Sequence, residues 1–142
     1  MKTWTKVLLI TIIFGLISFF LSRVLWTPNK DIMPTSGQLP FFIVLSILNS
    51  IVFGLGISFI IFGWSSVKNL LGNSALSLLS YLSLAWLLVS WWPHDNFHMQ
   101  VGLDLQGLLY IEYGFHVTLI LSSLIITYAF VKSTKSNNLL KN

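Results

Sequence analysis

Four long apolar runs, separated by short polar stretches, dominate the pattern of hydrophobic and polar residues along the chain. They cover residues 7–26, 41–64, 70–92 and 105–131. A transmembrane helix needs about 20 mostly apolar residues to cross a hydrocarbon core that is ~30 Å thick. Because each run reaches this length, the pattern predicts an all-α integral membrane protein in which four transmembrane helices form a small bundle.

The ends of the runs carry residues that typically begin or end helices. Pro40 suits the first turn of the second run, and Pro93 is expected to stop the third. Lys132 ends the fourth run, and residues 133–142 after it are predicted to be a disordered tail. Residues 1–142 are therefore expected to form a single membrane domain, with short connections at residues 27–39, 65–69 and 93–103.

The composition supports a membrane protein, because 55% of the 142 residues are hydrophobic and only 8% are charged. A soluble domain carries about 25% charged residues, and the mean hydropathy of this chain is +0.82. The net charge of +4 does not indicate nucleic-acid binding, since the sequence has no basic patch with interleaved aromatic residues. The expected partner is the lipid bilayer, and no nucleic-acid partner is predicted.

The distribution of lysine and arginine predicts the orientation, since cytoplasmic loops carry an excess of both. An inside N-terminus leaves only Arg23 and Lys30 on the outer side. The other cations then lie inside: Lys2, Lys6, Lys68, Lys132, Lys135 and Lys141. We therefore expect an N-in, C-in protein of a bacterial inner membrane or of a plasma membrane, with residues 93–103 outside.

Cysteine is absent from the chain, which excludes disulfides, thiolate metal sites and covalent c-type haem. Any metal must therefore be bound by histidine, carboxylate, tyrosine, methionine or backbone groups. The sequence contains no Walker A, GxGxxG, GxSxG or HExxH motif. No reaction is predicted, and whether the protein is an enzyme stays open.

The segment covering residues 91–116 concentrates the titratable chemistry. It holds all three histidines of the chain and three of its four carboxylates. Ionisable residues in membrane segments are costly and commonly mark functional sites. Glu112 and His116 are four residues apart on a predicted helix and should meet on one face. If the preceding loop forms a short helix, His94 and His98 share a face in the same way.

Two such pairs on neighbouring elements would offer a ligand shell for Zn, Fe, Mn or Cu. The candidate metal ligands are His94, His98, Glu112 and His116, with Asp95 as a candidate further ligand. Haem ranks lower, because only His116 lies on a predicted membrane helix. Asp104 precedes the fourth run and is expected to cap that helix instead of binding metal.

Three interpretations of this cluster stay open. The first is a metal-binding site at the outer rim of a small polytopic membrane protein. The second is a polar network that fixes helix packing in a non-catalytic subunit or assembly factor of a larger membrane complex. The third is a proton-linked or pH-sensing membrane protein, which would have to form a homo-oligomer to build a transport pathway.

Glycines on the second and fourth runs are expected to mark close contacts between helices. A residue without a side chain lets two helix backbones approach, and membrane helices commonly pack in this way. These residues are Gly54, Gly56, Gly63, Gly107 and Gly114.

Overall fold

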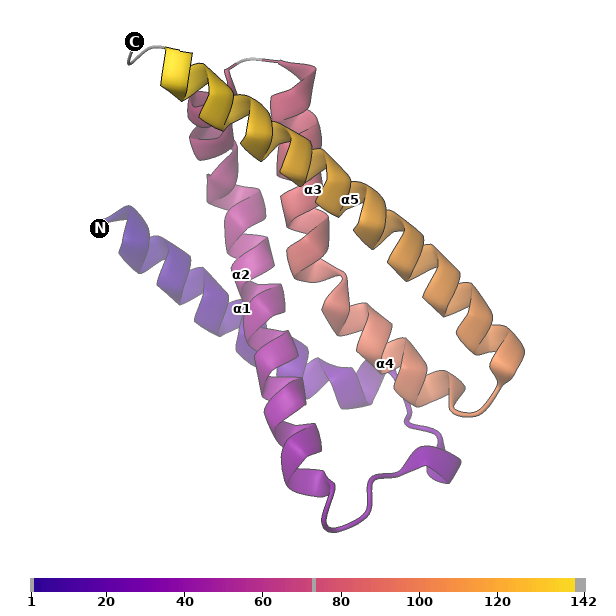
Figure 1. Cartoon of the computed structure of the whole chain (residues 1–142). Helices are drawn as coiled ribbons and strands as arrows, with labels where there is room; N and C mark the ends of the chain where they lie inside the picture. Colours follow the sequence, from indigo (N-terminus) through magenta and orange to yellow (C-terminus); the bar gives the residue numbers. More distant parts are fainter. Residues whose placement is uncertain (1, 73, 140–142) are drawn as a thin grey trace.

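The computed structural model describes residues 2–72 and 74–139, with side chains described as far as residue 134. Within these residues the chain forms helices and no β-strand, which confirms the all-helical prediction. The elements are α1 (Thr3–Leu25), a short 3-10 turn η1 (Lys30–Ile32), α2 (Leu39–Leu71), α3 (Ala75–Val89), α4 (Trp91–Val101) and α5 (Leu105–Leu139). In Figure 1 the chain descends along α1, rises along α2, descends along α3 and α4, and rises along α5. The α1–α2 and α4–α5 connections therefore lie at the same end of the molecule.

Three helices are long enough and apolar enough to cross a membrane, namely α1, α2 and α5. Among the described residues, α3 and α4 meet the same criteria as a pair that is bent by 41°. Counting this pair as one broken span gives four crossings. The structure thus supports a helical membrane protein with three or four spans, and the count of four stays a prediction.

The bend between α3 and α4 is explained by Pro93. A proline ring clashes with the carbonyl group four residues earlier, and that residue is Val89, the last residue of α3. The helix therefore breaks at Ser90 and resumes at once, with Pro93 in the first turn of α4, where the missing N–H is tolerated. The prediction that Pro93 stops the third run was wrong, and the predicted loop at residues 93–103 is mostly helical.

Other helix boundaries also differ from the predicted ones. α2 starts next to Pro40 as expected, but it continues through the predicted connection at residues 65–69 and ends before Gly72. Gly72 has a φ of 77°, a conformation that favours glycine and terminates helices. α5 continues beyond residue 131 to Leu139, into the predicted disordered tail. The last three residues of that tail lie outside the described residues.

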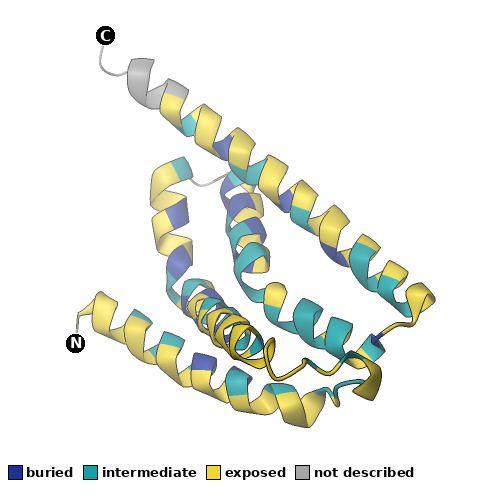
Figure 2. Cartoon of the chain, turned by 60° about the horizontal axis from the view of Figure 1, so that its bottom comes forward, coloured by how far each residue is buried: buried dark blue, intermediate teal, exposed yellow. Residues whose placement is uncertain are grey.

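Most residues buried in the bundle are small, whereas many large apolar residues are exposed. Figure 2 shows that buried positions are few and that exposed positions cover much of each long helix. Phe41 is 79% exposed and Phe20 is 68% exposed, and many leucines and isoleucines are exposed as well. In water such a surface would be unfavourable, but lipid tails solvate it well. Among residues 2–72 and 74–134, the buried polar residues are all serines: Ser18, Ser50, Ser58, Ser77, Ser80, Ser83, Ser90 and Ser122. This arrangement agrees with a membrane location.

Helices α1 and α2 approach most closely around Gly54. A Cβ atom on Gly54 would overlap the carbonyl oxygen of Thr11 and lie 2.8 Å from the backbone nitrogen of Gly15. One turn further along α2, the Ser58 hydroxyl donates to the carbonyl oxygen of Val7 at 3.0 Å and lies 2.9 Å from Thr11 Oγ1. The predicted close contact at Gly54 is therefore confirmed.

The other glycines divide between confirmed and unconfirmed contacts. A Cβ atom on Gly56 would lie 2.6 Å from Cγ1 of Val89 in α3, so this close contact is confirmed. The nearest atoms to Gly63 belong to Phe59 of the same helix, and a Cβ atom added to Gly114 would meet nothing within 4 Å. The prediction was wrong for Gly114, which lies on an open face of α5.

The connection that follows α1 is tied to the end of α4. The Asn29 N–H group donates to the carbonyl oxygen of Met99 at 2.8 Å. Gly102, which ends α4 with a φ of 66°, lies so close to Asn29 that an added Cβ would be 2.5 Å from the Asn29 amide nitrogen. This contact holds the α1–α2 connection beside the segment that carries the histidines.

Candidate metal centre

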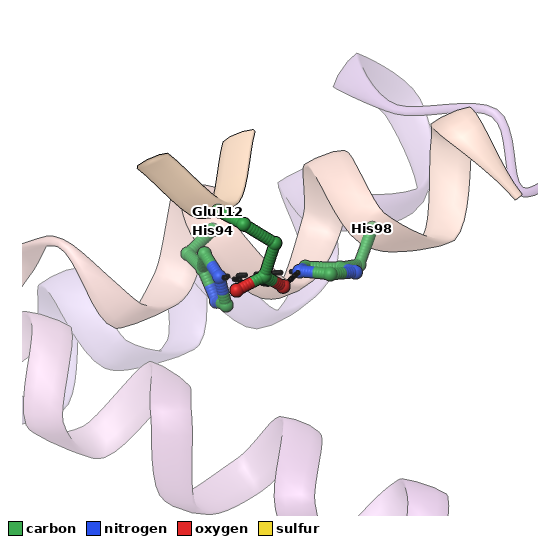
Figure 3. A group of neighbouring side chains, drawn as sticks. All are labelled: His94, His98 and Glu112. Atoms are coloured by element: carbon green, nitrogen blue, oxygen red, sulfur yellow. Dashed lines mark hydrogen bonds and ion pairs between the residues drawn. The ribbon is translucent and has the colours of Figure 1, made fainter. Parts of the chain in front are cut away.

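Two antiparallel helices, α4 and α5, bring three potential metal ligands together at one end of the bundle. One ligand atom from each of His94, His98 and Glu112 can be chosen so that all three lie within 4.8 Å of one another. Figure 3 shows the Glu112 carboxylate between the two imidazole rings. Because α4 is a helix, the four-residue spacing places His94 and His98 on one face, as the sequence predicted for a helical segment.

The separations between these atoms are close to those of a tetrahedral metal site. His98 Nε2 lies 2.7 Å from Glu112 Oε1 and 3.2 Å from His94 Nε2. His94 Nε2 lies 3.9 Å from Glu112 Oε1. Ligand atoms about 2.0–2.1 Å from a zinc ion in tetrahedral geometry are roughly 3.3 Å apart. The three observed distances fall on either side of this value, so an ion needs only small side-chain shifts to fit.

His94 is the most firmly held of the three ligands. Its side chain is only 10% exposed, and its ring stacks on Phe115 with a centroid distance of 3.8 Å and an interplanar angle of 22°. Its Nδ1 atom lies 3.3 Å from Oδ1 of Asp95. An ionised carboxylate only accepts hydrogen bonds, so we assign the ring proton to Nδ1. The Nε2 lone pair is then free and faces His98 and Glu112.

Asp95 is itself held by a residue from another helix. The side-chain amide of Asn49, in α2, donates to Asp95 Oδ2. The sequence proposed Asp95 as a metal ligand, but its Oδ1 atom contacts Nδ1 of His94, on the side of the ring away from the ligand group. The structure therefore places Asp95 behind His94, where it orients the imidazole.

Sequence reasoning missed Asn49 and Phe115 altogether. Phe115 lies next to His116 on α5 and reads as an ordinary apolar membrane residue. Asn49 gave one usable signal, because an asparagine within an apolar run is costly unless its amide is hydrogen bonded. Its partner is 46 residues away, so the sequence alone does not identify it.

His98 completes a hydrogen-bonded arrangement that exists without metal. With the lone pair of His94 Nε2 and the Glu112 carboxylate both acting as acceptors, His98 Nε2 must carry the proton between them. This proton lies between the same three atoms that could bind a cation. Metal binding through Nε2 would therefore require His98 to carry its ring proton on Nδ1 instead.

Glu112 and His116 meet as the four-residue spacing predicted. His116 Nδ1 lies 2.6 Å from Glu112 Oε2 and 3.0 Å from the Glu112 carbonyl oxygen. With two acceptors beside it, Nδ1 carries the ring proton. His116 thus contacts the carboxylate oxygen opposite to the one that faces His94 and His98, and it is not a member of the three-residue group.

The ligand group is open on one side. The Glu112 side chain is 41% exposed, and His98 and His116 are also partly exposed. Asp104, by contrast, acts as a helix cap as predicted, because its Oδ1 atom accepts the N–H of Gln106 at 3.1 Å. The arrangement can therefore bind a cation through three protein atoms and leave one coordination position open on the exposed side of the ligand group.

Comparison with known proteins does not assign the chain to a family. No protein-family model matches the chain, and neither a curated protein nor a solved structure is significantly similar to it. The functional inference therefore rests on the geometry of the cluster.

Proposed function

We propose that this chain is a membrane metalloprotein that binds one divalent transition-metal ion through His94 Nε2, His98 Nε2 and Glu112 Oε1. The observation that carries the proposal is the convergence of these donors, from two helices, to within 4.8 Å of one another. Each donor lies on a helix, which fixes its position better than a loop would.

The type of donor narrows the metal. Two imidazoles and one carboxylate are the ligands of many catalytic zinc sites and of non-haem Fe(II) sites with open positions. Imidazole also suits Cu, whereas Mn prefers oxygen ligands. Zinc is therefore the first ion to test. With three protein ligands, its fourth position would hold a water molecule or a substrate atom.

The spacing of the histidines argues against haem between them. Two axial imidazole nitrogens on opposite sides of a haem iron are about 4 Å apart, with the porphyrin plane between the rings. His94 Nε2 and His98 Nε2 are 3.2 Å apart and belong to successive turns of one helix face. These two residues fit a compact ion better than a macrocycle.

The support behind His94 also favours a metal site. Metal-binding histidines usually donate their second ring N–H to a carboxylate, which fixes the tautomer and the ring orientation. Asp95 accepts in this way from His94, and Asn49 holds Asp95 from α2. The supporting shell thus exists in the folded chain and joins two helices.

We also propose that the cluster lies at the outer side of the membrane, with both termini inside. The support for this orientation is the distribution of cations along the sequence. Lys68 lies in the last turn of α2 and Lys132 in the C-terminal part of α5, and the C-terminal ends of both helices lie opposite the α4–α5 connection (Figure 1). A single cysteine in place of the exposed Lys30, at the same end as the cluster, should react with an impermeant thiol reagent added outside. Labelling only from the cytoplasmic side would reverse the orientation.

A second function is favoured by the hydrogen bonds that exist without metal. Contacts from Asn49 to Asp95 and from His98 to Glu112 link α2, α4 and α5. The same residues would then fix helix packing in a non-catalytic subunit or assembly factor of a larger membrane complex. This function requires no metal affinity, so metal binding separates the two candidates.

The direct test is the zinc content of the purified, full-length protein. After stripping with chelator and equilibrium dialysis against Zn²⁺ in detergent, wild type should retain one zinc per chain. A variant with both His94→Ala and His98→Ala should retain none, whereas His116→Ala should keep the stoichiometry because His116 lies outside the three-residue group. A folded wild type that binds neither zinc, iron nor copper would exclude the metal site and leave the polar network.

A further inference from the structure

A cavity adjoins His98, one of the proposed metal ligands, on the side facing α2. It has a volume of about 310 Å³ and lies between α2 and α4. Asn49, Asp95 and His98 line it, so it reaches both a proposed ligand and the residues that support His94. Small-molecule sites in proteins have volumes of ~300–1,000 Å³, and this cavity is large enough to belong to that class.

A second cavity extends the first toward the end of α1. Its volume is about 200 Å³, and Arg23 is among its lining residues. The two cavities are adjacent, because five residues line both of them. These are Ser22, Phe42, Ser46, Asn96 and Met99. Together they form a path from the cation of Arg23 to the imidazole of His98, at the end of the molecule where the α1–α2 and α4–α5 connections lie (Figure 1).

The residues shared by the two cavities are of two kinds. Ser46 and Asn96 provide a hydroxyl and an amide group, which can donate hydrogen bonds to ester oxygens, whereas the Ser22 hydroxyl already donates to the Ser18 carbonyl oxygen. Phe42 and Met99 provide apolar surface, which favours methylene groups. A ligand that fits both must carry polar oxygens next to hydrocarbon chains.

Arg23 determines the charge of the ligand. It lies in the last turn of α1 and is exposed. The ion pairs found within residues 2–72 and 74–134 each join a histidine to a carboxylate, so none of them neutralises Arg23. A guanidinium group binds phosphate oxygens with two parallel hydrogen bonds. The end of the path that Arg23 lines is therefore suited to a phosphate.

We infer that the joined cavities bind an anionic glycerophospholipid, with its phosphate at Arg23 and its glycerol ester oxygens along Ser46 and Asn96. In such a lipid the ester groups lie directly beneath the phosphate. With the phosphate at Arg23, the ester oxygens would lie beside Ser46 and Asn96, and the adjoining methylene groups beside Phe42 and Met99. The lipid site goes beyond metal binding and does not require it. If the metal is present, the ester region of the lipid faces the end of the cavity that His98 lines.

Lipid retention by the full chain tests this inference. The detergent-purified, metal-stripped protein is mixed with phosphatidylglycerol or phosphatidylcholine, and bound lipid is counted by native mass spectrometry. Wild type should prefer phosphatidylglycerol. Arg23→Gln should reduce this preference about fivefold, because one basic residue near an anionic lipid contributes on that scale. Lys30→Gln is the matched control, since it removes the same charge at the same end and lines neither cavity.

A variant that fills the path provides a second test. Ser46→Trp places a large side chain where both cavities meet, and it should displace phosphatidylglycerol although Arg23 is intact. Should Ser46→Trp fail to fold, the exposed Arg23→Gln variant decides the result. Equal retention of the two lipids by wild type, or equal loss in Arg23→Gln and Lys30→Gln, would overturn the lipid site. Because the protein is metal-stripped, a failure of zinc binding leaves this outcome unaffected.

Discussion

The α1–α2 contact and the α4–α5 end of the bundle are built from opposite kinds of residue. Around Gly54 the two helices touch through backbone atoms and serine hydroxyls, and no ionisable side chain takes part in the described contacts there. At the α4–α5 end of the bundle, Glu112 and three histidines meet through side-chain atoms, and most of these side chains are partly exposed. The α1–α2 contact brings two helix backbones together, whereas the α4–α5 end brings ionisable side chains together.

This difference shows how a chain with few polar residues divides its tasks. Small residues let apolar helices pack in lipid, where the hydrophobic effect does not drive helices together. The ionisable groups are then not needed for packing of α1 against α2. Their concentration on α4 and α5 is what the proposed metal centre requires, and the two regions should then respond differently to substitution.

The largest expected effect is loss of zinc binding in Glu112→Gln. The amide keeps the shape of the side chain but loses the negative charge that faces His94 and His98. Zinc affinity should fall by more than the ~10–100-fold that changes in supporting residues cost. Competition with a coloured chelator measures the affinity. An affinity equal to that of wild type would remove Glu112 from the site.

Acidification should also weaken zinc binding, as Glu112→Gln does. An imidazole nitrogen binds metal only when it carries no proton, and a free imidazole titrates near pH 6.5. Lowering the pH from about 7.5 to about 5.5 should therefore weaken zinc binding by about 10–100-fold. The same titration on Gly54→Ala should show an equal pH dependence, because Gly54 lies in the region without ionisable groups. An affinity that is constant or rises on acidification would contradict histidine ligation.

Gly54→Ala and Gly114→Ala form a matched pair for the packing region. The added methyl group on Gly54 would overlap the Thr11 carbonyl oxygen, which should destabilise the protein by about 1–3 kcal/mol. At Gly114 nothing lies within 4 Å of the added atom. There the better helix propensity of alanine should stabilise the protein by up to about 1 kcal/mol. Thermal unfolding in detergent compares them, and a Gly54→Ala variant as stable as wild type would show that the contact is loose.

The smallest predicted effect on zinc binding concerns Asn49, which supports the site from α2. Asn49→Ala should weaken zinc binding about tenfold and leave the stoichiometry at one, because Asp95 then orients His94 less firmly. Ser46→Ala is the control, since Ser46 lines the same cavity one turn away. Equal effects of the two substitutions would show that Asn49 acts only through packing.

Much of the fold followed from the lengths of the apolar runs. Runs long enough to cross a bilayer predicted helices, and the structure has helices over each of them. The helix boundaries were less predictable. Pro93 was expected to end a helix, but a proline directly after a break also suits the first turn of the next helix. The sequence does not distinguish these two outcomes, although they decide whether His94 and His98 share a helix face.

The candidate site was predictable within helices and unpredictable between them. The spacing of Glu112 and His116 fixes their contact, because it follows from the pitch of one helix. The role of Asp95 depends on Asn49 in α2, and this contact depends on how α2 is rotated against α4. Rotation about a helix axis is set by packing, as the open position of Gly114 also shows.

The most direct measurement is the X-ray absorption spectrum of the zinc-loaded protein in detergent. Ligation by His94, His98 and Glu112 predicts nitrogen and oxygen atoms about 2.0–2.1 Å from zinc, with the outer-shell scattering of two imidazoles. His98→Ala should reduce this scattering to one imidazole or abolish zinc binding, whereas Lys68→Gln should change nothing. A spectrum without imidazole scattering, or one that is the same in wild type, His94→Ala and His98→Ala, would contradict the metal centre.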